Sequence, residues 1–218
     1  MGRMFLLLAL VLSPHAAQTQ QPMLNLVFLG YSLTEGVPHS HGDVDTYPFM
    51  VCQQFAASGP ACTKIPYRGQ TTGYLREKLD SWLFALLKPG AQNVLVLWAS
   101  TNDLATGAGN VQTTFMNLLA MARLAHAAGW QVVVVDIIAR DNYFTTPQLQ
   151  AAFPANQAAL NALILNSTEF DTVVDPAAIL TDPTKANYYW DGTHLWPAGF
   201  QIISNLVAQA IRRLQGAA

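Results

Sequence analysis

A serine, an aspartate and a histidine in this sequence have the types and spacing that nucleophilic catalysis requires. Ser32 follows an apolar run that breaks at Gly30, and Asp191 stands three residues before His194. A serine hydroxyl is a weak nucleophile unless a base lies within hydrogen-bond reach, and an imidazole can accept its proton and return it to a leaving group. A carboxylate three residues earlier in a tight loop can reach that imidazole and fix its tautomer. The three residues are therefore candidates for nucleophile, general base and orienting carboxylate.

Two further residues could donate hydrogen bonds to a developing oxyanion. Gly69 lies in the stretch YRGQTTG, and Asn102 lies in WASTNDLATG. A glycine allows close approach of its backbone N–H because it has no Cβ, and an asparagine amide can be preorganised toward negative charge. Each residue taken alone also fits a structural role, with Ser32 as a turn serine, Gly69 as a helix-entry glycine and Asn102 as a turn asparagine.

Five short apolar runs predict the strands of a central sheet. They span residues 24–29, 62–66, 93–98, 131–138 and 171–175. The third and fourth runs are too uniformly apolar for a sheet with one exposed face, which favours parallel pairing. Strands that alternate with helices predict an α/β fold.

Apolar residues between and after these runs recur at the spacing of amphipathic helices. Less distinct helical patterns cover 118–126 and 158–165, and Pro197 suits the first turn of a last helix. The two clearest apolar faces are Leu75, Leu79, Trp82, Leu83 and Leu86, and then Phe200, Ile203, Val207, Ile211 and Leu214.

The candidate residues all fall at one edge of the predicted sheet. Ser32, Gly69 and Asn102 follow the first three strands, and Asp191 and His194 lie in the loop before the last helix. Ligands of open parallel sheets bind beyond the carboxyl ends of the strands. We therefore expect the five residues to converge on one rim.

The sequence resembles the SGNH (GDSL-type) hydrolase superfamily in four ordered blocks, of which the second is represented by Gly69 alone. The segment Gly30–Gly36 reads GYSLTEG where the family usually has G-D-S-L-T-x-G, and Ser100–Asp103 reads STND where the family has G-x-N-D. The block D-x-x-H appears as Asp191–His194. The resemblance runs in order over residues 24–214. It implies a three-layer α/β/α, flavodoxin-like fold around a mostly parallel, five-stranded sheet.

The resemblance also implies roles for the candidate residues. Ser32 would be the nucleophile, His194 the general base and Asp191 the residue that orients it. The backbone amides of Ser32 and Gly69, with the side chain of Asn102, would form the oxyanion hole. No metal or other cofactor is implied.

The sequence departs from the family pattern beside two of these blocks. Tyr31 replaces the usual aspartate before the serine, and Ser100 replaces the usual glycine of the third block. The asparagine often found upstream of Gly69 is absent, and Asp103 matches a position that tends to be structural. These changes affect the shape of the turn and pocket rather than the nucleophile, base or oxyanion donors.

The first 20 residues have the pattern of a secretory signal. Arg3 is followed by the apolar stretch 4–12 and by Ala16 and Ala17, and nine apolar residues are too few to span a membrane core of ~30 Å. We predict a signal peptide over 1–17, with approximate cleavage there, and a single domain over 22–215. Export to an extracellular or periplasmic location favours a disulfide between Cys52 and Cys62, although two buried thiols are the alternative.

Composition and the remaining motifs exclude several classes of protein. A formal charge of −2 without a basic cluster argues against a nucleic-acid partner, and no G-x-G-x-x-G follows a strand, which argues against dinucleotide binding. His39, His41, Asp43 and Asp45 lie close together, but we interpret them as a solvated loop rather than a metal site. Asn166 would accept a glycan only in a eukaryotic source.

These observations predict a secreted serine esterase that acts through an acyl-enzyme on carboxylic esters of small alcohols, sugars or lipids. We expect no stable membrane anchor. The alternatives are a lysophospholipase or thioesterase on longer acyl chains, and an inactive carbohydrate-binding module on the same fold. Aromatic residues in 142–147 and at Tyr188, Tyr189, Trp190 and Trp196 either line an acyl or sugar site or cover the core.

Overall fold

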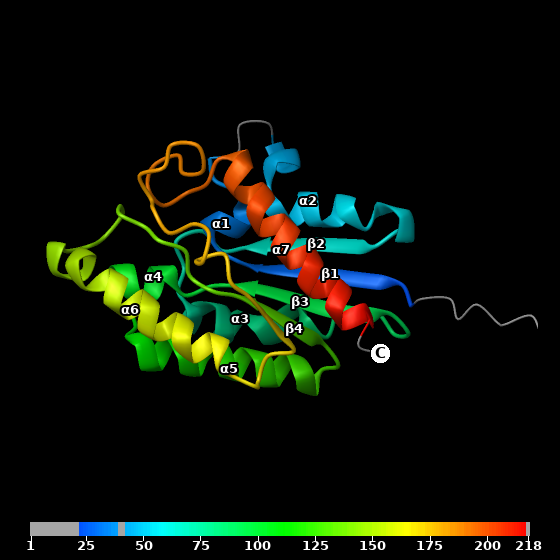
Figure 1. Ribbon diagram of the computed structural model, residues 1–218. Coiled ribbons are helices and arrows are strands. Elements are labelled where there is room, and N and C mark those ends of the chain that lie inside the picture. The colour runs from blue at the N-terminus through cyan, green and yellow to red at the C-terminus, as the bar shows by residue number, and fades with distance from the viewer. Residues whose placement is uncertain (1–21, 39–41, 217–218) are drawn as a thin grey trace, which may run out of the picture.

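The computed structural model describes residues 22–38 and 42–216, and its centre is a five-stranded sheet (Figure 1). The strands lie in the order β2-β1-β3-β4-β5, and every neighbouring pair is parallel. The expected α/β fold with a five-stranded sheet is therefore confirmed. The strands are β1 (Leu24–Gly30), β2 (Ala61–Pro66), β3 (Gln92–Trp98), β4 (Gln131–Val135) and β5 (Thr172–Val174).

Helices cover both faces of the sheet, which gives the three layers (Figure 1). On one face α2 (Tyr47–Gln54) packs against α7 (Pro197–Gly216). On the other face α5 (Val111–Ala127) packs between α3 (Thr72–Leu83) and α6 (Pro147–Leu165). The short helices are α1 (Ser32–Glu35), α4 (Thr101–Thr106) and the 3₁₀ turns η1 (Gly42–Asp45) and η2 (Ala56–Ser58).

Two helices begin earlier than the apolar pattern predicts because polar residues cap them. The Asn110 side chain accepts a hydrogen bond from Thr113 N, and Thr113 Oγ1 accepts one from Asn110 N, so that α5 starts with a capping box. Thr146 caps α6, and Pro147 occupies its first turn. The predicted segments 118–126 and 158–165 are the C-terminal parts of these helices.

The fourth strand is shorter than the predicted run 131–138. β4 ends at Val135, although Asp136 N still donates to Val174 O. The backbone of Ile137 bonds instead to α6, because its N–H donates to Asn161 Oδ1 over 3.0 Å and its carbonyl accepts from Asn161 Nδ2 over 2.8 Å. The Asn161 side chain of α6 thus makes the two backbone hydrogen bonds that a neighbouring strand would otherwise make with Ile137.

The core lies on both faces of the central strands. β1 is buried along its whole length, as expected for a parallel strand covered on both sides. Phe28, Tyr47 and Trp98 meet edge to face beneath the carboxyl edge, with ring centroids 5.7 and 5.3 Å apart. Burying a large apolar side chain contributes about 1.5–3 kcal/mol, so this cluster supports the end of the sheet that carries the site.

The predicted disulfide is present and joins α2 to β2. Cys52 and Cys62 are bonded, and they are the two cysteines of the chain. A loop of this length stabilises the folded state by about 3 kcal/mol on the chain-entropy model.

Two of the sequence-based predictions fall partly or wholly outside the described residues. These are the signal peptide over 1–17 and the histidines His39 and His41. Within residues 22–38 and 42–216, no helix is long and apolar enough to cross a membrane, and no group of acidic, histidine or cysteine side chains is arranged to hold a metal ion.

Candidate active site

Four of the five predicted residues, Ser32, Gly69, Asn102 and His194, line one cavity of about 390 Å³ at the carboxyl edge of the sheet, and Asp191 lies behind His194, bonded to its ring. Ser32 begins α1 directly after β1, Gly69 lies between β2 and α3, and Asn102 lies in the first turn of α4 after β3. The loop before α7 brings His194 to the same cavity. The parallel topology places these segments together although they are far apart in the chain.

A continuous line of hydrogen bonds joins the serine to the aspartate. Ser32 Oγ lies 3.0 Å from His194 Nε2, and His194 Nδ1 lies 2.8 Å from Asp191 Oδ2. The serine can therefore pass its proton to Nε2 while the carboxylate holds the opposite ring nitrogen in its protonated form. In this geometry the Asp191 carboxylate can stabilise the positive charge that the imidazole of His194 gains when it accepts the serine proton.

Two glycines allow the tight turn that presents the serine. A Cβ on Gly30 would clash with Thr34 Oγ1 and with the carbonyl oxygen of Trp98. Gly36 ends α1 with φ +92°, in the left-handed region that favours glycine. The chain therefore leaves β1 and enters α1 with Ser32 facing the cavity.

Asp191 is held as an anion by the donors around it. Burial alone would raise the pKa of Asp191, but hydrogen bonds from His194 N (2.7 Å), from the His194 ring and from Tyr143 OH (2.7 Å) outweigh burial and lower this pKa. Thr193 N donates a further bond of 3.0 Å. The carboxylate is thus ready to stabilise a protonated imidazole.

Asn102 and Gly69 line the same cavity as Ser32. Asn102 Nδ2 donates to Gln70 O over 2.9 Å. Gly69 has φ +72°, which a residue with a side chain rarely adopts. The backbone N–H groups of Ser32 and Gly69 and the second N–H of the Asn102 amide are the candidate donors to an oxyanion in this cavity.

Asp103, beside Asn102, has the structural role expected of it. Its carboxylate accepts hydrogen bonds from Thr72 N (2.9 Å) and Thr72 Oγ1 (2.5 Å). Burial raises the pKa of Asp103, while these bonds oppose that rise. The pairing joins the start of α3 to α4 and so sets the segment around Gly69 against Asn102.

The departures from the family pattern at Tyr31 and Ser100 are accommodated in different ways. Tyr31 is buried, and its phenolic oxygen accepts a hydrogen bond from Thr101 N over 3.3 Å, so it links the nucleophile turn to α4. Burial raises the pKa of Tyr31, so the side chain stays neutral. Ser100 has φ +120°, a conformation that favours glycine, and its hydroxyl donates to the carbonyl oxygen of Ala99. The usual glycine is thus replaced at the cost of local strain.

The sequence-based reasoning missed Arg140 as a residue of the cavity and assigned Tyr143 no specific contact. Both line the cavity, and both follow β4. The rule that placed the other residues, namely that polar side chains after parallel strands gather at one edge, applies equally to this segment.

The aromatic residues near the site divide into two groups. Trp190 is 46% exposed and lines the cavity, and Tyr143 also lines it. Tyr189 is buried and donates to Leu180 O over 2.9 Å, so it belongs to the core rather than the site. Trp196 packs edge to face against Trp190, with ring centroids 6.3 Å apart.

Comparison with known proteins identifies relatives of the same fold. Residues 28–202 match the GDSL-like Lipase/Acylhydrolase family. No sequence among curated proteins is significantly similar to this chain.

Solved structures cover most of the chain. A putative acylhydrolase from Bacteroides fragilis has 25% identity and a TM-score of 0.69, over 90% of this chain and 92% of that one. A GDSL-like lipase from Bacteroides thetaiotaomicron has 21% identity and a TM-score of 0.68, over 89% and 92%. A carbohydrate esterase family 3 protein from Talaromyces cellulolyticus has 18% identity and a TM-score of 0.65, over 90% and 100%.

Proposed function

This chain belongs to the GDSL-like Lipase/Acylhydrolase family of carboxylic ester hydrolases, and we propose that it cleaves esters with Ser32 as nucleophile, His194 as base and Asp191 as the orienting carboxylate. The observation that carries this assignment is the unbroken line from Ser32 Oγ to His194 Nε2 and from His194 Nδ1 to Asp191 Oδ2, with distances of 3.0 and 2.8 Å.

Acylation follows from this geometry. Ser32 Oγ attacks the ester carbonyl carbon while its proton passes to His194 Nε2, and the carbonyl π electrons move to the oxygen. The backbone N–H groups of Ser32 and Gly69 and the Asn102 amide donate to that oxyanion. Collapse of the intermediate breaks the bond to the alcohol, which leaves with the proton from Nε2. The product is an acyl-enzyme ester on Ser32.

Deacylation uses the same groups in the same roles. His194 takes a proton from a water molecule, the resulting hydroxide attacks the acyl carbon, and the proton returns to Ser32 Oγ as the acid departs. Asp191 stays ionised throughout and stabilises the imidazolium that forms in each half-reaction.

The lining of the cavity favours a small acyl group and a polar alcohol. Among the described lining residues the aliphatic side chains are Leu33 and Val37, and the others are polar, aromatic or glycine. A long acyl chain needs a continuous aliphatic wall, which two such side chains are too few to form, so we favour a short acyl group over the longer chains of a lysophospholipase or long-chain thioesterase. The half-exposed ring of Trp190 offers a flat surface for an alcohol such as a sugar.

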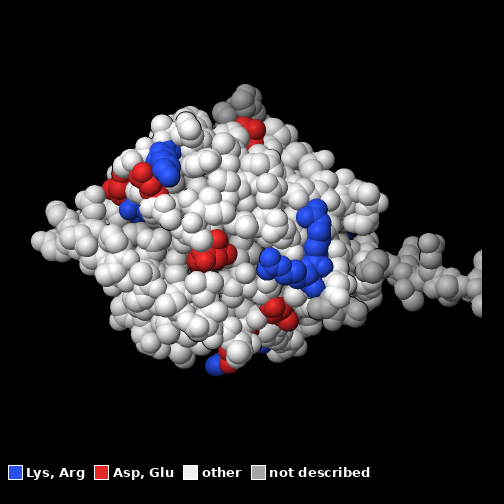
Figure 2. Space-filling model, in the orientation of Figure 1, with Lys and Arg blue, Asp and Glu red and all other residues white. Residues whose placement is uncertain are grey.

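We also propose that the enzyme acts outside the cytoplasm. The disulfide between Cys52 and Cys62 supports this location, because such bonds persist in oxidising compartments. The face of the molecule shown in Figure 2 carries separate groups of basic and acidic side chains among mostly uncharged residues, and the formal net charge is −2, which suits a neutral small-molecule substrate better than a nucleic acid.

A covalent probe tests the assignment of the nucleophile. A phosphonate ester with a good leaving group should label Ser32 in the folded protein, and peptide mass spectrometry should locate the added mass there. The matched controls are Ser32→Ala and wild-type protein unfolded in urea, both of which should stay unlabelled. A label on another residue of folded protein would overturn the assignment. Turnover of nitrophenyl esters of increasing acyl length, with acetylated sugars alongside, then measures the substrate preference.

A further inference from the structure

Arg140 is a buried cation that lies between the two halves of the active site. It follows β4, and it is 8% exposed. Its Nη1 donates toward α4, to Thr101 Oγ1 over 3.3 Å and to Asn102 Oδ1 over 3.5 Å. One end of the guanidinium thus faces the side chain that we assign to the oxyanion hole.

The other edge of the guanidinium holds the segment beside Asp191. Arg140 Nε donates to Asn142 O over 3.0 Å, and Nη2 donates to Tyr143 O over 3.1 Å. These two residues contact the catalytic loop, because Tyr143 OH donates to Asp191 Oδ2 and Asn142 Nδ2 donates to Asp191 O. One side chain therefore bonds to both the oxyanion side and the carboxylate side of the site.

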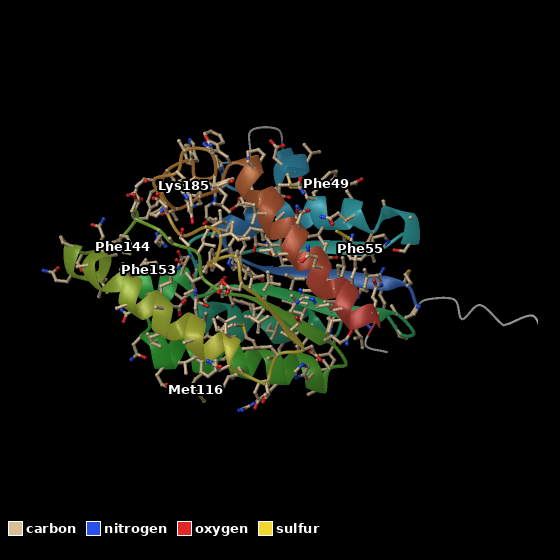
Figure 3. The ribbon with its side chains drawn as sticks, in the orientation of Figure 1. Phe49, Phe55, Met116, Phe144, Phe153 and Lys185 are labelled. Carbon is tan, nitrogen blue, oxygen red and sulfur yellow. A yellow bond between two sulfur atoms is a disulfide. The ribbon has the colours of Figure 1, made fainter. Side chains whose placement is uncertain are left out.

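An aromatic ring covers the guanidinium from a third direction. The Arg140 Cζ atom lies 5.2 Å from the ring centroid of Phe144, within cation–π distance. Phe144 in turn packs edge to face on Phe153 of α6, with centroids 5.2 Å apart, and both rings are labelled in Figure 3. The packing restricts the guanidinium to one position.

The charge of Arg140 is not neutralised by an ion pair. Across the described part of the chain, no carboxylate lies within ion-pair distance of it, and its acceptors are amide, hydroxyl and carbonyl oxygens. Burial lowers the pKa of Arg140, while the more distant Tyr31 and Asp191 oppose this effect. A buried cation without a counterion is costly, and its positive potential acts on the cavity that it lines.

The contacts of the Asn102 amide select one of its two orientations. A guanidinium can only donate, so it requires the oxygen of Asn102 to face Arg140. The carbonyl of Gln70 can only accept, so it requires the nitrogen of Asn102 on the opposite side. A flipped amide would place donor against donor and acceptor against acceptor. Arg140 and Gln70 therefore agree on the orientation that leaves an N–H for the oxyanion.

We propose that Arg140 is a positioning residue of the oxyanion hole, which fixes the orientation of the Asn102 amide so that one of its N–H groups faces the oxyanion. The inference rests on the proposed function, because it needs Asn102 as a donor. It predicts that Arg140 affects the chemical step more than substrate binding.

A double-mutant cycle with a neutral ester tests the proposal. With nitrophenyl acetate, Arg140→Gln should lower kcat about 10- to 100-fold and Asn102→Ala about 10²- to 10³-fold, while KM changes by less than about 3-fold. In the Asn102→Ala background, Arg140→Gln should lower kcat by less than about 3-fold further, because no amide remains to be positioned. Arg140→Lys, which keeps the charge but loses the planar fork, should be intermediate.

The controls separate positioning from a general loss of structure. Arg123→Lys is the matched control, because Arg123 makes a bidentate pair with Glu169 at an exposed site and should keep wild-type kcat. Thermal melts identify variants that do not fold, and Arg140→Lys replaces Arg140→Gln in the cycle if the latter is one of them. Added guanidinium ion should partly restore kcat to Arg140→Ala, but not to Arg140→Ala with Asn102→Ala.

Three outcomes would overturn the proposal. Additive losses of kcat would show that Arg140 does not act through Asn102. A raised KM with unchanged kcat would make Arg140 a substrate-binding residue, and wild-type kinetics would make it purely structural. Failure of the proposed function gives a different result, since Ser32→Ala would then keep full turnover and Ser32 would escape the phosphonate probe.

Discussion

Asp191 and Asp136 are two carboxylates in different regions of the carboxyl edge, and their surroundings differ sharply. Asp191 lies in the loop before α7, where its oxygens accept from two backbone N–H groups, an imidazole and a phenol. Asp136 follows β4 and is completely buried. Its Oδ1 accepts from Ala177 N over 3.4 Å, and its Oδ2 has no hydrogen-bond partner among the described residues.

The difference shows that the supply of donors, rather than burial alone, decides whether a carboxylate keeps its charge. Burial acts on both groups in the same direction. At Asp191 the donors outweigh burial and lower the pKa. At Asp136 burial and then the neighbouring Asp175 raise the pKa to about 9. Asp191 therefore keeps its negative charge more readily than a free carboxyl group, while a pKa of about 9 keeps Asp136 protonated at neutral pH.

Substitution of Asp191 should have a far larger effect on turnover than the same substitution of Asp136. Asp191→Asn should lower kcat by about 10³- to 10⁴-fold, because an amide can hold His194 in the wrong tautomer. Asp136→Asn replaces a neutral carboxyl group with an amide of similar shape, and its kcat should stay within about 3-fold of wild type. Steady-state kinetics with one nitrophenyl ester measure kcat of both variants relative to the wild type. Equal losses in the two variants would show that Asp191 has no special role.

The raised pKa of Asp136 should make the free energy of unfolding depend on pH. Asp136 binds its proton more tightly when folded than when unfolded, where its pKa is about 3.9. Its contribution is therefore fully present below about pH 4 and is lost as pH rises toward about 9. Asp136→Asn cannot ionise, so it should flatten this decline and raise the free energy of unfolding at alkaline pH by about 1–3 kcal/mol.

Urea unfolding of wild type and Asp136→Asn at several pH values, with the disulfide intact, measures this difference. The two curves of unfolding free energy against pH should diverge between about pH 4 and about pH 9. Parallel curves would mean that Asp136 ionises normally in the folded protein. Because Asp136 lies apart from the cavity, kcat at a fixed pH gives an independent check that the variant is folded.

Removal of a single hydrogen-bond donor from Asp191 should have a small effect on turnover. Tyr143→Phe deletes the phenolic hydroxyl that donates to Asp191 Oδ2 over 2.7 Å. Tyr143 is 52% exposed, so we expect a loss of about 1 kcal/mol, or about 5-fold in kcat. The pKa of Asp191 should rise, because one of the bonds that lower it is gone. The acid limb of the kcat profile should therefore move to higher pH. An unchanged profile would show that the remaining donors suffice.

Several features could be predicted from the sequence because they depend on short stretches of chain. The apolar run before Gly30, the serine that follows it, and the spacing of Asp191 and His194 are all local. Parallel pairing then brings the carboxyl ends of the strands to one edge, so the sequence alone predicts that Ser32, Gly69 and Asn102 lie near each other. The boundaries were less accurate where side chains replaced a sheet partner, as Asn161 does for Ile137 at the end of β4.

Other features were decided only by the tertiary structure, because they depend on contacts between distant segments. Tyr31 could be judged only when its hydroxyl was found to bond Thr101, 70 residues away. Arg140 has an ordinary place in the sequence, yet its donors reach Asn102 on one side and the segment beside Asp191 on the other. The charge states of Asp191 and Asp136 likewise depend on donors and neighbours that the fold assembles. Sequence thus determined which groups can react, and the folded environment determined how they are oriented and charged.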